Sequence, residues 1–251
     1  MSNIFEPLTL AAGSHESGSG KGCAMNVISW ENGDKVITDY PACSDHFLSK
    51  IVQEVNDHLA ENNGILSAAD SIIALDLGHA TVGTTNHNLS DAELDFVYVR
   101  CTAFAARKVS HFDTTGTALT AILAAEKGVY EPTEENATAA GAATDAITYI
   151  LRPEVFSGSP AADFALEAAR YASFALTVAG DQDRSRAAAE LCYSNVVKST
   201  VAAEVVGSTN RIRIDLAWEI IDLFKALTGT DSPAVDETAV ASAVEKMRAH
   251  A

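Results

Sequence analysis

The residues best suited to chemistry are two thiols and two imidazoles in one segment near the N-terminus. They are His15, Cys23, Cys43 and His46, in the arrangement H-x7-C-x19-C-x2-H. Zinc favours thiolate and imidazole ligands, and four of them close a tetrahedral structural site that would fix an irregular, glycine-rich segment. Asp39 competes with His46 as the fourth ligand, or orients a ligating imidazole as an acceptor. The pattern therefore predicts a zinc site.

Two other interpretations use the same residues. In the first, the cysteines are reduced thiols packed as small apolar side chains, with a histidine at the surface. In the second, Cys23 is a nucleophile, because it follows a glycine and precedes a helix whose N-terminus would stabilise a thiolate. His15 or His46 would then be the base and Asp39 or Asp45 would orient it, for acyl transfer through a thioester.

The remaining cysteines and several histidines have simpler interpretations. Cys101 and Cys192 lie within apolar-patterned helices and are predicted to be core residues. His79, His87 and His111 lie near predicted loops, without ligand partners at a usual spacing, and are predicted to be surface residues. The candidate site is thus confined to the N-terminal segment.

The elements that must position this site are predicted to be helices. Residues 23–30 fit a short helix that ends near Asn32-Gly33, although the same Asn-Gly pair would also suit the turn of a β-hairpin. Ser44 or Asp45 caps the next helix, which is predicted to end at Asn63-Gly64.

Further helices follow in close succession. A weaker one is predicted over 68–77, followed by a polar loop over 78–88. Ser90 and Glu93 form a capping box for a helix over 91–109, and another spans 115–127 with Gly128 as its stop. Five more, rich in alanine, are predicted between the starts and stops 133–152, 159–180, 181–207, 208–229 and from 236 onward.

This pattern predicts an all-α fold. Connections of two to eight residues between helices indicate antiparallel neighbours in a multi-helix bundle. We expect an N-terminal Cys/His cap with the first helices over 1–64 and an alanine-rich bundle over 65–251, joined in one continuous globular domain.

Composition limits the classes of partner. The chain has 17 basic and 34 acidic residues, and this net charge of −17 argues against nucleic acid and anionic membranes as direct partners, because binding to phosphates depends on basic side chains. No segment approaches the ~18 apolar residues of a membrane span, and the start MSNIFEPLTL lacks the basic region of a secretory signal. We expect a cytoplasmic protein whose partner is another protein or a second copy of itself.

Three short motifs resemble a known family. They are the Gly-Ser-His loop ending at His15, the Gly-Cys-Ala-Met run 22–25 and the Asp-Tyr-Pro-Ala-Cys run 39–43. They are similar to the GSH, G-x-C-x-M-E and D-H-P-x-C motifs of uncharacterised proteins from actinobacteria and their phages. This sequence has Asn26 where that family has Glu and Tyr40 where it has His. The resemblance implies a helix after Cys23, an alanine-rich helical tail and a phage-linked origin, which would place the protein in the host cytoplasm.

The function expected from these observations is non-enzymatic. It is a phage-related binding or assembly protein whose N-terminal segment is fixed by a structural zinc or by a thiol cluster. The first alternative is a cysteine-dependent hydrolase or acyltransferase that uses Cys23. The second is an acidic inhibitor of a host DNA-binding protein, which would present one carboxylate-rich face.

Overall fold

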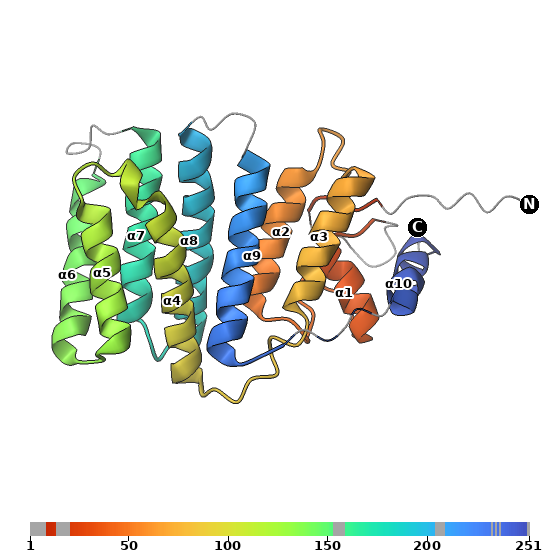
Figure 1. The fold of residues 1–251 in the computed structure, drawn as a ribbon, viewed down its shortest axis with the longest axis horizontal. Helices are drawn as coiled ribbons and strands as arrows, with labels where there is room; N and C mark the ends of the chain where they lie inside the picture. Colours follow the sequence, from red (N-terminus) through yellow and green to blue (C-terminus); the bar gives the residue numbers. More distant parts are fainter. Residues whose placement is uncertain are drawn as a thin grey trace, which may run out of the picture. The chain divides into compact units, whose positions relative to one another are not determined.

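The computed structural model describes residues 9–13, 21–152, 159–203, 209–231, 233, 235 and 237–249. Over these residues the chain forms ten α-helices and one short 3₁₀ helix, and it contains no β-strand. Two isolated β-bridges, Ala11–Ile65 and Ser44–Val82, tie loops together. The prediction of an all-α, multi-helix fold is confirmed (Figure 1).

The chain divides into two compact units. Unit 1 consists of residues 1–87 and 229–251, and unit 2 consists of residues 88–228. The sequence had suggested a division after residue 64. In the structure, residues 65–87 belong with the N-terminal segment because helix α3 packs against α1 and α2.

The described residues of unit 1 form four helices. They are α1 (Ala24–Asn32), α2 (His46–Leu59), α3 (Ala68–Thr81) and α10 (Glu237–Ala249), and both α3 and α10 pack against α1. The helical interpretation of the segment after Cys23 is therefore correct, and its Asn-Gly pair ends a helix. Gly33 adopts the left-handed conformation (φ 75°) that suits a residue without Cβ. Asp45 caps α2 by accepting hydrogen bonds from the backbone amides of Phe47 and Leu48.

Polar side chains hold the irregular segment 9–13 in unit 1. Asn56, fully buried on α2, donates through Nδ2 to the carbonyl of Ala11 (2.9 Å) and accepts through Oδ1 from the amide of Ala24 (3.3 Å). Ser71 of α3 accepts from the amide of Leu10 at 2.9 Å. Backbone groups of this segment, which has no helix or sheet of its own, thus find the partners that burial requires.

Unit 2 contains the other six helices, and helices consecutive in the chain lie side by side (Figure 1). The central one, α7, packs against α4, α5, α6 and α8, while α9 packs against α4 and α8. Their bounds are α4 (Asp91–Val109), α5 (Thr117–Tyr130), α6 (Glu134–Ile150), α7 (Pro160–Thr177), α8 (Gln182–Ala202) and α9 (Thr209–Thr228), with the 3₁₀ helix Ser110–Phe112 after α4.

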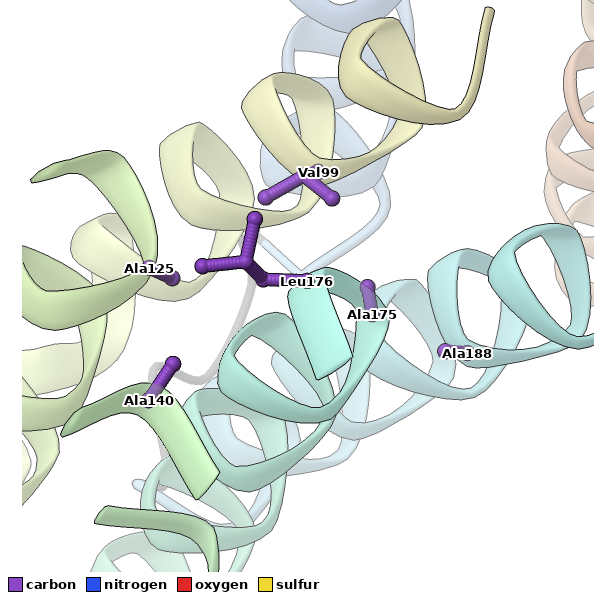
Figure 2. Packing of buried hydrophobic residues seen from close by; sticks show 6 residues of the cluster. All are labelled: Val99, Ala125, Ala140, Ala175, Leu176 and Ala188. Atoms are coloured by element: carbon purple, nitrogen blue, oxygen red, sulfur yellow. The ribbon is translucent and has the colours of Figure 1, made fainter. Parts of the chain in front are cut away.

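Alanines dominate a buried cluster of unit 2. Figure 2 shows Leu176 of α7 between helices that otherwise contribute small side chains. Four of the six residues in this cluster are alanines, which lets the helix backbones approach closely. The cluster consists of Val99, Ala125, Ala140, Ala175, Leu176 and Ala188.

Two glycines that were predicted to lie just beyond the ends of helices lie inside them. Gly78 is part of α3, where a Cβ would lie 3.1 Å from Cγ1 of Ile28. Gly128 is part of α5, where a Cβ would lie 2.0 Å from Cδ2 of Leu176. Both positions lack a side chain because a neighbouring residue occupies the space, so the two predicted stops were wrong.

Candidate functional site

Cys23 lies at the N-cap of α1 and is almost fully buried, with 1% of its surface exposed. Its Sγ donates to Oδ1 of Asp39 at 3.5 Å. Asn26 connects the same groups, because its Nδ2 donates to that Asp39 oxygen at 2.8 Å and its Oδ1 accepts from the amide of Cys23 at 3.1 Å. The thiol, the carboxylate and the amide thus form one closed cluster, here called the Cys23 cluster.

The position of Cys23 at a helix N-terminus was predicted correctly, but the expected lowering of its thiol pKa is outweighed by burial. Burial raises the pKa of the Cys23 thiol to about 12, and the negative charge of Asp39 adds to this effect. The backbone amides of Asn26 and Met25 act in the opposite direction but are outweighed. Cys23 therefore stays a neutral thiol at neutral pH, which disfavours it as a nucleophile.

Cys43 and His46 contact residues outside the Cys23 cluster. Cys43 is half-buried, and its Sγ lies 3.8 Å from Oγ of Ser44. Burial is the main cause that raises the pKa of the Cys43 thiol. The ring of His46, the first residue of α2, stacks on the ring of Tyr40 with centroids 3.8 Å apart and an interplanar angle of 5°.

The predicted zinc ligands are not assembled as a metal site in the part of the chain that the structure describes. No three His, Cys, Asp or Glu side chains in that part are grouped so that they could hold a metal ion. Among the predicted ligands, Cys23 and Asp39 contact each other, whereas Cys43 and His46 contact other residues. His15 lies outside the described residues. The zinc site therefore stays a prediction.

The structure reveals a polar pair that the sequence had not indicated. His79 was predicted to be a surface residue, but it lies on the last turns of α3 with only 9% of its surface exposed. Its Nε2 lies 2.9 Å from Oε2 of Glu31 on α1. This pair joins two helices, and it was missed because α3 was expected to end before residue 78.

A cavity of about 200 Å³ lies beside this pair in unit 1. Glu31, His79 and Cys43 line it together with apolar side chains, among them Ile28 and Val82. The cavity brings a carboxylate, an imidazole and a thiol to the same space, although it does not include Cys23. A signal that could have revealed it is the helical periodicity of α3 continued through Gly78.

Unit 2 contains another cavity, of about 330 Å³, with a different character. Its lining includes Lys108 and Glu219, which form an ion pair with Nζ and Oε2 2.6 Å apart. These two charged groups are therefore paired with each other.

The two cysteines that were predicted to be core residues are buried, which confirms that prediction. Cys101 and Cys192 are both 0% exposed, and Cys192 donates to the carbonyl of Ala168 at 3.3 Å. Of the two other histidines that were predicted to be surface residues, His111 is exposed and His87 is half-buried. These cysteines and histidines add no candidate site.

Within the described ranges, no helix combines the length and the apolar character needed to cross a membrane. Comparisons of the chain with protein families, with curated proteins and with solved structures found no match.

Proposed function

We propose that this chain is a non-enzymatic binding or assembly protein, phage-related as its motifs suggest, whose N-terminal segment is fixed by a cluster around a buried thiol. The observation that carries the proposal is the state of Cys23: it is 1% exposed and its Sγ donates to Asp39. A nucleophilic cysteine needs an accessible thiolate, and Cys23 has neither the exposure nor the pKa for it. Its role is then to stabilise the segment.

Binding would use an exposed apolar stripe on helix α5. Leu119, Leu123 and Tyr130 are 40%, 48% and 69% exposed, and their spacing places them on one face of the helix. The one carboxylate of α5, that of Glu126, lies on this same face, but it forms an ion pair with Arg107 of α4, whereas the chain as a whole carries a net charge of −17. Because two copies of so acidic a chain repel each other, a face whose acid is paired with an arginine is where they would approach most readily. We therefore take the partner to be a second copy of this chain.

The first test measures thiol reactivity in the folded protein. Iodoacetamide is added to the reduced full-length chain, and the modification of each cysteine is followed by peptide mass spectrometry. We expect Cys43, which is half-exposed, to react well before Cys23, which should react only on unfolding. If Cys23 reacted first in the folded protein, the structural role of its thiol would be refuted and the hydrolase interpretation would be favoured. Elemental analysis of the same sample tests the zinc prediction.

The second test measures self-association. Sedimentation equilibrium of the full chain should show a concentration-dependent dimer that Leu123→Glu abolishes. Leu191→Glu is the matched control, since Leu191 has nearly the same exposure (46% against 48%) but lies on α8. A monomer at all concentrations, or equal weakening by the two variants, would contradict the α5 interface.

A further inference from the structure

The cavity of unit 1 has acceptor capacity that is not used within the described protein. Glu31 lines the cavity, and its Oε2 is bonded to His79. Its other oxygen, Oε1, is buried and has no hydrogen-bond partner in the described part of the chain. A buried polar atom without a partner costs free energy, so such an atom beside a cavity indicates that a donor belongs there.

The charge around the cavity selects the type of donor. Its described lining residues include no lysine or arginine, whereas Glu31 contributes a carboxylate. Unit 1 as a whole has 15 acidic and 5 basic residues in the sequence, a net charge of −10. The field in this unit therefore favours a cation over a neutral or anionic ligand.

The walls and the size of the cavity limit the cation further. Ile28, Val82 and Val235 provide apolar surface, which suits a hydrocarbon chain. About 200 Å³ is less than the roughly 300–1,000 Å³ of sites for drug-sized ligands. A divalent metal fits less well, because no three His, Cys, Asp or Glu groups in the described residues are placed to ligate one.

We infer that this cavity binds a small organic cation, a protonated primary amine with a short aliphatic chain. The ammonium group lies at the Glu31 carboxylate and donates to Oε1. The hydrocarbon chain packs against Ile28 and Val82, and the Cys43 thiol and the His79 ring form the polar side of the cavity. This site is independent of the α5 stripe in unit 2 and adds a ligand-binding function to the proposed assembly role.

The test uses n-butylammonium chloride as the probe and 1-butanol as its neutral counterpart. Binding to the full-length chain is measured by titration with protein-observed NMR. We expect butylammonium to bind at least about tenfold more tightly than butanol, because a hydrogen bond to a charged group favours the ammonium. Glu31→Gln should remove this preference, whereas Glu61→Gln, the same charge change at an exposed residue outside the cavity lining, should retain it.

A second variant keeps the test decisive if Glu31→Gln does not fold. Ala239→Leu adds bulk to the cavity wall from α10 and should weaken butylammonium binding without changing any charge. Equal binding of butanol and butylammonium would refute the cation site and indicate a merely apolar cavity. Binding of neither probe would also refute it, and would indicate that Oε1 is satisfied by water.

Discussion

The interactions that stabilise the interior of unit 1 differ from those that stabilise the interior of unit 2. Unit 1 relies on polar side chains that reach between elements: Asn56 bonds to two backbone groups, and Asp39 receives hydrogen bonds from Cys23 and Asn26. The buried cluster of unit 2 is mostly alanine, and the buried hydrogen bonds between helices of this unit include those of small side chains such as Ser173, which donates to the carbonyl of Ala140.

The difference follows from the regularity of the backbone. The described part of unit 1 includes non-helical segments whose buried amides and carbonyls need partners, and side-chain amides and carboxylates supply them. In unit 2 the helices satisfy their own backbone, so the remaining requirement is close packing. Polar substitutions should therefore be most harmful in unit 1 and changes of volume most harmful in unit 2.

The largest effect is expected for Asn56→Leu. It leaves the carbonyl of Ala11 and the amide of Ala24 without their side-chain partner, at a cost of about 1–3 kcal/mol for each group. Asn195→Leu in unit 2 is the control. Asn195 is also buried, but among the described residues its amide donates to the carbonyl of Leu191 within its own helix, so the loss should be below about 1 kcal/mol. Urea unfolding measures both, and equal losses would remove the distinction between the units.

The second-largest effect on the free energy of unfolding is expected for Gly128→Ala in unit 2. The new methyl group would lie 2.0 Å from Cδ2 of Leu176, so that side chain must move within a packed cluster. Overpacking should outweigh the better helix propensity of alanine and lower the free energy of unfolding by about 1–2 kcal/mol. Gly141→Ala, where the nearest atom is Cγ2 of Thr177 at 3.9 Å, should instead add about 0.5–1 kcal/mol. A gain in both variants would show that the packing at Gly128 is not tight.

The smallest effect concerns the pH dependence of stability. The pKa of Cys23 is raised from 9.0 to about 12 in the folded chain, so the thiol ionises first in the unfolded chain. Its contribution to stability is complete below pH 9 and is lost as the pH rises from 9 towards 12. At pH 10 the loss is about 1.4 kcal/mol.

Urea midpoints measured from pH 8 to 11 under reducing conditions test this prediction. The wild type should lose more stability than Cys23→Ser, because serine does not ionise in this range. Cys192→Ser in unit 2 is the comparison, since burial also raises the pKa of that thiol, but no carboxylate contributes. Equal losses of stability in the wild type and in Cys23→Ser would contradict the prediction that the Cys23 thiol stays neutral in the folded chain.

Much of the fold could be predicted from local sequence. Ser90 with Glu93 marks the start of α4, and Thr133 caps α6 as expected, because capping depends on residues within one turn. Gly78 and Gly128 were misinterpreted because a glycine at a helix contact and a glycine at a helix end look alike in sequence. The neighbours that decide between them, Ile28 and Leu176, lie about 50 residues away in the chain.

The candidate site was predictable only in part. The position of Cys23 at a helix start followed from the glycine before it, but its partner Asp39 lies 16 residues away across a loop. Because α3 was expected to end before residue 78, His79 was placed in a loop, and its pair with Glu31 was not predicted. Contacts between elements, which sequence periodicity does not report, decide which polar residues meet.

The discontinuous course of unit 1 has a consequence for folding during synthesis. Helix α10 packs against α1, yet Glu237 follows Asn32 by 205 residues and all of unit 2 lies between them. Contacts so distant in the chain carry a large loop-closure cost and form late. On the ribosome, unit 2 is complete before α10 emerges. The surface of α1 that α10 covers therefore stays exposed until residues 237–249 have been translated, and during this stage a chaperone or a wrong partner would compete for it.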